Sequence, residues 1–342
     1  MNKVLITGGA GFIGTHTADY FLNNGDEVTI FDNFSRKGTR ENITWLKEKY
    51  GDKEIKIVEG DIRTEGKLND EVKDQNLVIH LAAQVAVTTS VKNPREDFEI
   101  NAMGTLNLLE SVRNNSPETV VIYASTNKVY GEMEKLGVIK GEHGYGYTDR
   151  PKGISELQNL DFHSPYGCSK GAAEQYVHDY SKIYGLKTVV FRQSCIYGTR
   201  QFGIEDQGWI SWFTIASILN KPTTVYGDGY QVRDVLWVED LVKAYDLAFV
   251  KIKTTSGQVY NIGGGTDNSL SVNELLNKLN PKIKPIYSTW RPGDQKVYVS
   301  DIGKVSKELG WKPEISVDQG LEGLISWTKE NKALIESVLR SY

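Results

Sequence analysis

Residues 4–14 are Val4-Leu5-Ile6-Thr7-Gly8-Gly9-Ala10-Gly11-Phe12-Ile13-Gly14, and this stretch decides the fold. Its apolar first part predicts a buried strand, and a helical pattern begins at Phe12. Gly8, Gly11 and Gly14 have the spacing Gly-x-x-Gly-x-x-Gly. Glycines at a strand-to-helix turn let the backbone approach a pyrophosphate, which the positive end of the helix then stabilises. The stretch therefore predicts the opening strand, turn and helix of a dinucleotide-binding protein.

The alternation of strand and helix continues through the first half of the chain, as in α/β proteins. The strand candidates are Val4–Thr7, Val28–Asp32, Ile55–Glu59, Leu77–Leu81, Val120–Ser125 and Thr188–Arg192. Helix candidates lie near 12–23, 65–74, 98–114 and 166–184. The strands are almost continuously apolar, which is typical of a parallel sheet covered on both faces. We therefore predict a doubly wound parallel sheet of the Rossmann type.

The pattern loosens after Arg192, where the chain becomes richer in Trp, Gly and Pro. Val235–Trp237, Glu239–Val250 and Val259–Ile262 look like a resumption of the sheet pattern. We therefore expect a smaller, interwoven substrate-binding lobe. The expected dinucleotide-binding domain comprises 1–193 and 234–263, and most of the lobe comprises 194–233 and 264–342.

The long segment 132–163 is rich in glycine and is expected to carry little regular structure. It directly precedes a candidate catalytic region, so we favour a lid or a substrate-facing loop over disorder.

Composition excludes several classes of protein. A formal net charge of −4 gives no footprint for nucleic acid or an anionic membrane, and no apolar run is long enough to span a membrane. The two cysteines form no C-x-x-C motif, which favours a reducing cytoplasm. The five histidines lack metal-ligand spacing, so no metal is expected. Cys168 is assigned no chemistry.

Polar residues at the predicted strand ends suit a dinucleotide. Asp32 ends the second strand, where a carboxylate accepts hydrogen bonds from the adenosine ribose and favours NAD. Arg36 and Lys37 follow closely and keep NADP as an alternative, because a cation can accept a 2′-phosphate. His80 is expected to be a structural histidine. The predicted cofactor-binding set is Gly8, Gly11, Phe12, Ile13, Asp32, Asn33, Ser35, Arg36, Asp61, Ile62, Leu81, Ala82, Ala83, Tyr166 and Lys170.

The chemistry is predicted to centre on Tyr166 and Lys170. A lysine four residues after a tyrosine lies on the same face of a helix. Its charge favours the phenolate and lowers the pKa of the tyrosine, which can then take a proton from a hydroxyl group. Thr126, at the end of the fifth strand, is the candidate for positioning that hydroxyl. The predicted catalytic set is Thr126, Tyr166 and Lys170.

Together these motifs resemble the extended short-chain dehydrogenase/reductase family of nucleotide-sugar-modifying enzymes. The matching residues are Thr7–Gly14, Asp32, Asp61-Ile62, His80–Ala83, Thr126, Tyr166, Lys170 and Tyr197-Gly198. The resemblance implies bound NAD, with the tyrosine as base and the lysine on the nicotinamide ribose. It also implies that helices 98–114 and 166–184 pair subunits, so a homo-oligomer, dimer or tetramer, is expected.

The residues after Thr126 narrow the expected reaction. The 4,6-dehydratases of the family carry Asp-Glu there as acid and base, whereas this chain has Asn127 and Lys128. An amide and an ammonium cannot perform those proton transfers, so dehydration is disfavoured and epimerisation remains.

Longer strings resemble the family's epimerases that act at carbon 2 of CDP-linked dideoxyhexoses. They are Phe31–Gly38, Ser125–Gly131, Leu160–Gly171, Arg200–Phe202 and Asp206–Trp209, whereas Ala124 and Gln193 depart from the pattern. The alternatives that stay open are a carbon-4 epimerase of UDP- or GDP-sugars, a non-catalytic NAD(H)-binding sensor, and epimerisation by enolisation.

A nucleotide-sugar diphosphate is negatively charged, and arginine binds such groups well. Arg233 and Arg291 match the family's diphosphate arginines. The predicted substrate-binding set is Gln84, Val85, Thr88, Thr126, Arg200, Trp209, Arg233 and Arg291.

Overall fold

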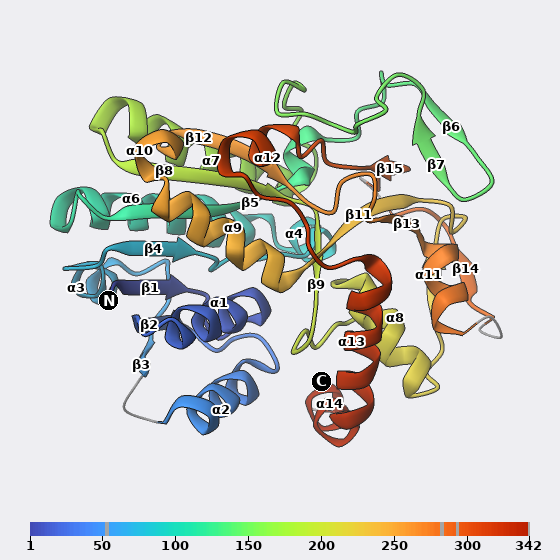
Figure 1. Ribbon diagram of the computed structural model, residues 1–342, viewed down its shortest axis with the longest axis horizontal. Coiled ribbons are helices and arrows are strands. Elements are labelled where there is room, and N and C mark those ends of the chain that lie inside the picture. Colours follow the sequence, from blue (N-terminus) through green and yellow to red (C-terminus); the bar gives the residue numbers. More distant parts are fainter. Residues whose placement is uncertain (52–54, 281–283, 292–293, 341–342) are drawn as a thin grey trace. The chain divides into compact units, whose positions relative to one another are not determined.

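The computed structural model describes residues 1–51, 55–280, 284–291 and 294–340. Packing divides the chain into two compact units, each assembled from separate segments (Figure 1). Unit 1 comprises Met1–Val129, Ser164–Arg192 and Val242–Tyr260, and unit 2 comprises Tyr130–His163, Gln193–Leu241 and Asn261–Tyr342.

Unit 1 is built on a seven-stranded sheet in the order β12-β8-β5-β4-β1-β2-β3. Its strands are β1 (Lys3–Thr7), β2 (Glu27–Asp32), β3 (Ile55–Glu59), β4 (Leu77–His80), β5 (Val120–Thr126), β8 (Lys187–Gln193) and β12 (Gln258–Ile262). Strand β1 pairs in parallel with both β2 and β4, and β2–β3 and β4–β5 are also parallel. The strand order reverses at β1, and ligands of such sheets bind beyond the carboxyl ends at this point. The predicted doubly wound α/β fold is confirmed.

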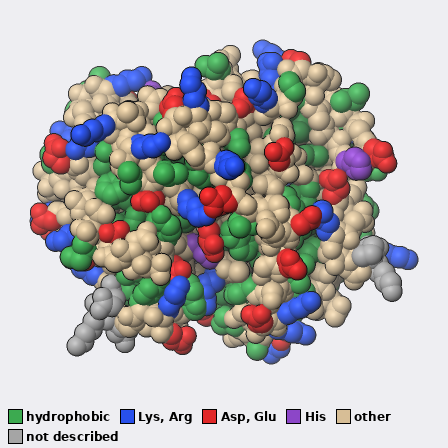
Figure 2. Space-filling view, in the orientation of Figure 1, with side chains coloured by type: hydrophobic (Ala, Val, Ile, Leu, Met, Phe, Trp, Pro, Cys, Tyr) green, Lys and Arg blue, Asp and Glu red, His purple; other side chains and the backbone are tan. Residues whose placement is uncertain are grey.

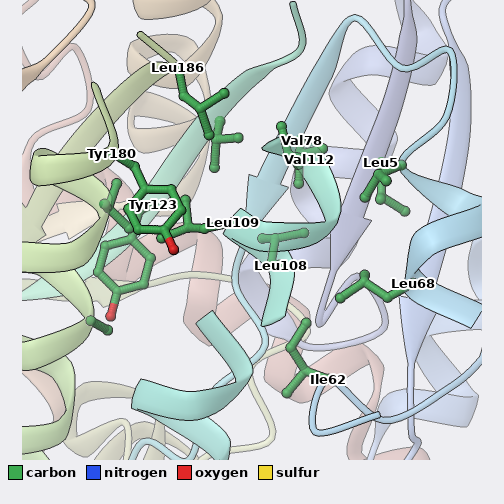
Figure 3. Close-up of a cluster of buried hydrophobic side chains, with 14 of the residues drawn as sticks. Leu5, Ile62, Leu68, Val78, Leu108, Leu109, Val112, Tyr123, Tyr180 and Leu186 are labelled. Carbon is green, nitrogen blue, oxygen red and sulfur yellow. The ribbon is translucent and has the colours of Figure 1, made fainter. Parts of the chain in front are cut away.

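One face of this sheet is covered by α3 (Glu65–Glu71), α6 (Gly104–Asn115) and α7 (Ser164–Tyr184). Figure 3 shows the buried cluster on this face, where Leu108 and Leu109 of α6 gather with Leu5 and Val78 of the sheet. Each fully buried aliphatic side chain contributes roughly 1.5–3 kcal/mol to folding. This core fixes α7, which carries two of the predicted catalytic residues.

Helices α1 (Phe12–Asn23) and α9 (Val238–Val250) belong to the opposite face. The Tyr20 hydroxyl of α1 donates a hydrogen bond to Asp246 of α9 at 2.9 Å, and Tyr245 packs on Phe191 of β8. Helix α2 (Thr39–Tyr50), which was not predicted, packs on α1 through a hydrogen bond from the Tyr50 hydroxyl to Asp19.

The chain between β4 and α6 forms three short turns of helix. These are α4 (Val87–Lys92), α5 (Pro94–Phe98) and the π-helical turn η1 (Glu99–Met103). The helix predicted near 98–114 is therefore a π turn that continues into α6. After β5, the 3₁₀ turn η2 (Asn127–Tyr130) follows, and α10 (Ile252–Thr255) follows α9.

Unit 2 has its own sheets and its own core. Its strands are β9 (Cys195–Tyr197), β10 (Thr224–Tyr226), β11 (Val232–Trp237), β13 (Ser269–Ser271), β14 (Ile286–Ser288) and β15 (Val297–Tyr298). Its helices are α8 (Trp209–Ile218), α11 (Val272–Leu279), α12 (Gly303–Leu309), α13 (Val317–Glu330) and α14 (Lys332–Arg340). The prediction that Val235–Trp237 returns to the main sheet is wrong, because β11 pairs with β9, β13 and β15.

The segment 132–163 packs in unit 2 and contains one short hairpin of β6 (Val138–Lys140) and β7 (Tyr145–Tyr147). Lys140 fastens this hairpin: its Nζ lies 2.9 Å from Asp228 Oδ2 and 3.7 Å from the centre of the Tyr230 ring. The Tyr145 hydroxyl donates to the same Asp228 carboxylate at 2.8 Å. Most of the segment is irregular, as predicted, and its role as a lid stays a prediction.

The surface carries both signs of charge. Figure 2 shows acidic and basic side chains interspersed over the face that it draws. No helix in the described part of the chain is long and apolar enough to cross a membrane.

Candidate active site

The glycine turn between β1 and α1 brings two backbone segments into contact. Gly8 has φ +70°, and its amide donates to the carbonyl of Phe31 at 2.8 Å. A Cβ on Gly8 would lie 2.7 Å from the backbone nitrogen of Ala82, and a Cβ on Gly14 would overlap the backbone of Gly8 and Gly9. Side chains at these positions would therefore push apart the turn and the chain after β4.

The start of α1 suits an anion. Its N-cap is Gly11, and among the described residues no side chain caps this end and no acidic side chain lies in the first turn. The first amides of a helix lack partners within the helix, so they are donors for a negatively charged ligand. Phe12 and Ile13 lie in this turn, and their amides are placed as the pyrophosphate of a dinucleotide requires.

Asp32 is buried at the end of β2, beside the glycine turn. Its carboxylate accepts from the amides of Ala10 at 3.0 Å and Phe34 at 2.8 Å. Burial raises the pKa of Asp32, whereas these two amides and Arg36 oppose the rise. A carboxylate held rigidly at this strand end suits the ribose of an adenosine.

The next strand end is tied to it by hydrogen bonds. Asn33 Nδ2 donates to Asp61 Oδ2 at 3.1 Å, and the Asn33 side chain accepts from the amide of Ser35. Arg63 pairs with Asp61 through two bonds of 2.7 and 2.9 Å, and this hydrogen bonding keeps the pKa of Asp61 well below its usual range. These residues form one connected edge at the ends of β2 and β3.

The other predicted cofactor residues of unit 1 fall in two places. Leu81, Ala82 and Ala83 follow β4 beneath the glycine turn and are partly exposed. Ile62 belongs to the core, where it packs against Gly104 of α6, so its side chain faces protein.

Tyr166 and Lys170 are buried on α7, which packs against β5, and Thr126 ends that strand. Burial raises the pKa of Tyr166 to about 12, against opposing effects of the Thr126 hydroxyl and Arg36. The lowered tyrosine pKa predicted from the sequence is therefore not found in this structure, because desolvation of the phenolate outweighs the charges around it.

Lys170 is affected in the opposite direction, because burial disfavours its charged form. Burial lowers the pKa of Lys170 to about 7, while Glu174 and Asp97 oppose the change. Its Nζ lies 4.2 Å from the centre of the Tyr123 ring. Among the described residues it has no hydrogen-bond acceptor, so its N–H groups remain available for ribose hydroxyls.

His80 is a structural histidine, as predicted. Its Nδ1 lies 2.6 Å from the Thr7 hydroxyl and its Nε2 lies 3.0 Å from the Thr105 hydroxyl. Burial, with a further effect of Lys170, lowers its pKa to about 3. The ring is therefore neutral.

Sequence reasoning missed a buried network on both sides of Lys170. On one side, Glu174 accepts from Ser125 at 2.5 Å and from Arg192 at 2.5 and 2.9 Å. Continuing the four-residue spacing of Tyr166 and Lys170 would have pointed to Glu174.

On the other side, the Ser169 hydroxyl donates to Asp97 Oδ2 at 2.5 Å. Asp97 Oδ1 accepts from Gln84 Nε2 at 3.0 Å and from Asn101 Nδ2 at 3.2 Å. Asp97 and Ser169 are far apart in the chain, so no local motif connects them.

The substrate candidates of unit 1 lie between β4 and α4. The Gln84 amide is already bonded at both ends, to Ala86 and to Asp97, so it acts first as a brace of this loop. The buried Thr88 hydroxyl has no partner among the described residues, which makes it the better candidate for a ligand contact. Val85 lies between them and is partly exposed.

The substrate candidates of unit 2 include two arginines that already have carboxylate partners. Arg233 contacts Asp294 at 3.0 Å and donates to the carbonyl of Gln295 at 2.6 Å. Arg291 contacts Asp206 at 3.0 Å, and its guanidinium stacks 3.8 Å from the centre of the Tyr226 ring.

Two further candidates lie elsewhere in unit 2. Arg200 is buried and has a left-handed backbone, with φ 59°. Trp209 begins α8, and its buried indole N–H has no partner among the described residues.

Comparisons with known proteins agree over nearly the whole chain. The model of the GDP-mannose 4,6-dehydratase family matches residues 5–324. The CDP-paratose 2-epimerase of Salmonella typhi is 45% identical over 337 residues, which are 95% of this chain and 99% of that protein.

Two solved structures show the same architecture. The UDP-glucose 4-epimerase of Thermotoga maritima, solved with UDP-glucose, has a TM-score of 0.81 at 30% identity, covering 96% of this chain and 99% of its own. A dTDP-glucose 4,6-dehydratase of Streptomyces venezuelae with NAD bound has a TM-score of 0.83 at 28% identity, covering 98% and 99%.

Proposed function

The chain belongs to the GDP-mannose 4,6-dehydratase family, among the extended short-chain dehydrogenases/reductases, and from this membership we propose that it is an NAD-dependent nucleotide-sugar epimerase. The proposed reaction is inversion at carbon 2 of a CDP-linked sugar, CDP-paratose to CDP-tyvelose. The relative of 45% identity is named for that reaction, and this similarity supports the choice of base and sugar.

One observation favours epimerisation over the dehydration that gives the family its name. Asn127 and Lys128 occupy the η2 turn directly after Thr126, at the end of β5. Neither an amide nor an ammonium can serve as the acid and base pair that eliminates water. An inversion by removal and return of hydride does not need that pair.

The residues of unit 1 fit NAD. The uncapped start of α1 suits the pyrophosphate, Asp32 the adenosine ribose, and Lys170 the nicotinamide ribose. When bound, NAD supplies the acceptor for the hydride that leaves carbon 2 and the donor that returns it.

The protein residues handle the hydroxyl proton. Tyr166 takes the proton from the hydroxyl on carbon 2 and returns it after the face of attack has changed. Thr126 orients that hydroxyl, and the positive charge of Lys170 favours the phenolate form of Tyr166. Arg233 and Arg291 are proposed to meet the diphosphate.

The deciding experiment is incubation of the purified protein with CDP-paratose and with CDP-tyvelose, without added cofactor, followed by product analysis. We expect each sugar to be converted into the other. No conversion of either sugar, together with carbon-4 inversion of UDP-hexoses in the same assay, would replace our assignment by the UDP-sugar alternative, which the Thermotoga neighbour favours.

Two other mechanisms are tested in the same assay. In heavy water, hydride return leaves the inverted carbon without deuterium, whereas enolisation introduces deuterium there. A non-catalytic NAD(H)-binding sensor would show no turnover of any nucleotide sugar and no difference between wild type and Tyr166→Phe.

We further propose that α6 and α7 form the interface of a homo-oligomer. The two helices pack together, and α7 exposes Tyr176, Ile183 and Tyr184, whose spacing places them on one face. Ile183 is 66% exposed, which is unusual for a large aliphatic side chain on a helix that packs in a core. Exposed apolar faces of this kind mark interaction surfaces.

A further inference from the structure

The buried carboxylate of Asp97 is surrounded by neutral donors. Asp97 is 1% exposed and lies on α5, which packs against α7. Within the described chain, its hydrogen-bond donors are Ser169, Gln84 and Asn101, and none of them carries a charge. A buried carboxylate without a cation nearby is unfavourable, so its charge needs a partner within reach.

Glu174, the other buried carboxylate of this region, has its partner already. Arg192 contacts it through two guanidinium nitrogens, and the side chains of the pair are 0% and 7% exposed. The two opposite charges of this pair compensate each other. Glu174 therefore contributes less net negative charge to its surroundings than Asp97 does.

Lys170 is the buried cation that lacks such a pair. It follows Ser169 directly in α7, and Ser169 is the residue whose hydroxyl holds Asp97. The Lys170 ammonium lies over the Tyr123 ring and forms no direct ion pair within the described chain. Its attraction to Asp97 therefore acts through space, in a region of low dielectric where such forces are strong.

The other groups that face Lys170 carry no compensating charge. His80 on β4 is neutral, because its pKa falls to about 3 through burial and the effect of Lys170. Burial raises the pKa of Tyr123 on β5 well above its usual range, and burial raises that of Tyr166 to about 12. Among these neighbours, Asp97 and Glu174 are the negative charges, and Glu174 is already paired with Arg192.

We propose that Asp97 is the counter-charge that keeps Lys170 protonated, and that Ser169 holds its carboxylate in place for this purpose. Asp97 is thus a positioning residue for the reaction proposed above, because it acts through Lys170 and not on the sugar. Without it, the ammonium that binds ribose and favours the tyrosine phenolate would lose its proton at lower pH.

The electrostatics agree with this geometry from both sides. Burial lowers the pKa of Lys170 to about 7, and Glu174 and Asp97 oppose that change. Burial raises the pKa of Asp97, and the Ser169 hydrogen bond and Lys170 oppose that change. Each of the two groups therefore favours the charged form of the other.

The test measures the titration of Lys170 itself. The protein is labelled with [13Cε]lysine, with and without saturating NAD, and the Lys170 signal is assigned by its loss in Lys170→Met. We expect Asp97→Asn to lower the midpoint of the Lys170 titration by roughly one pH unit, the usual size of such a charge effect. Asp97→Glu, which restores the charge, should restore the midpoint.

Glu99→Gln is the matched control, because it removes a carboxylate from the same segment at an exposed position beside Arg95. Its Lys170 midpoint should equal that of wild type. A wild-type midpoint in Asp97→Asn would overturn the proposal. If Asp97→Asn does not fold, Ser169→Ala takes its place, and it should lower the midpoint in the same direction.

This readout needs no turnover, so it separates the role of Asp97 from the proposed reaction. If CDP-sugars are not converted, the Lys170 titration still decides whether Asp97 is its counter-charge. If they are converted, the alkaline limb of kcat should move to lower pH in Asp97→Asn and stay in place in Glu99→Gln.

Discussion

Tyr166 is the residue on which the proposed chemistry depends most directly. Tyr166→Phe removes the hydroxyl that accepts the proton and keeps the buried ring, so the fold and NAD binding should persist. We expect kcat for CDP-paratose and CDP-tyvelose to fall roughly 100- to 10,000-fold. Tyr176→Phe is the control, because it makes the same change at an exposed position of the same helix.

The burial of Lys170 should appear in the pH dependence of stability. Its pKa is about 7 in the folded protein and roughly 10.4 in an unfolded chain. Between these values the unfolded state binds more protons, so stability rises with pH and is lost as pH falls through the folded pKa.

Lys170→Met removes this dependence. The free energy of unfolding of the variant, minus that of wild type, should increase as pH falls from about 10 to about 7. Urea unfolding at a series of pH values measures this difference. A difference that is constant with pH would show that the Lys170 pKa is not lowered by folding.

The local motifs explain which residues could be predicted. Gly8, Asp32, Tyr166 and Lys170 stand in short patterns whose spacing reflects one turn or one helix. The bond between Ser169 and Asp97 joins positions 72 residues apart, and only the packing of α5 on α7 creates it. Residues that act through such bonds leave no periodic signal in a single sequence.

At the scale of elements, the β1–α1 turn gives a sharp test of close packing. Gly14→Ala places a Cβ against the backbone of Gly8 and Gly9. Overpacking of this kind lowers stability by about 1–3 kcal/mol, and the distorted turn should also lose NAD. Gly66→Ala is the control, because a Cβ there meets no atom within 4 Å, so the helix should gain up to about 1 kcal/mol.

Thermal unfolding and the NAD content of the purified variants measure both effects. Equal stability and NAD content in Gly14→Ala and wild type would mean that the turn relaxes without consequence.

The strands of unit 1 were predictable because each is a continuous apolar run in a regular alternation with helices. The run Val235–Trp237 looks the same, yet its partners are β9, β13 and β15. An apolar run predicts that a strand is buried, and it does not say in which sheet. Helix α2 was missed because its buried side chains are few: Thr39, Asn42, Ile43 and Leu46.

At the scale of the whole molecule, the exposed face of α7 predicts assembly. Ile183→Asp places a charge in the proposed interface, so the oligomer should dissociate into smaller species. Size-exclusion chromatography with light scattering measures the mass. Ile139→Asp, at an exposed position of the β6–β7 hairpin, is the control and should leave the mass unchanged.

Fold class and family could be predicted for the whole chain, whereas the architecture of unit 2 could not. Its strands are short, and its core gathers side chains from distant segments, from Tyr197 to Leu324. The aromatic residues of this region predict burial without fixing what each one packs against.

Arg233 and Arg291 each hold a carboxylate of the protein, Asp294 and Asp206. A diphosphate that meets these arginines would displace one anion with another, as on an ion-exchange resin loaded with its counter-ion. The number of charges neutralised would then change little on binding. Substrate affinity should therefore vary less with salt concentration than two unpaired arginines would suggest.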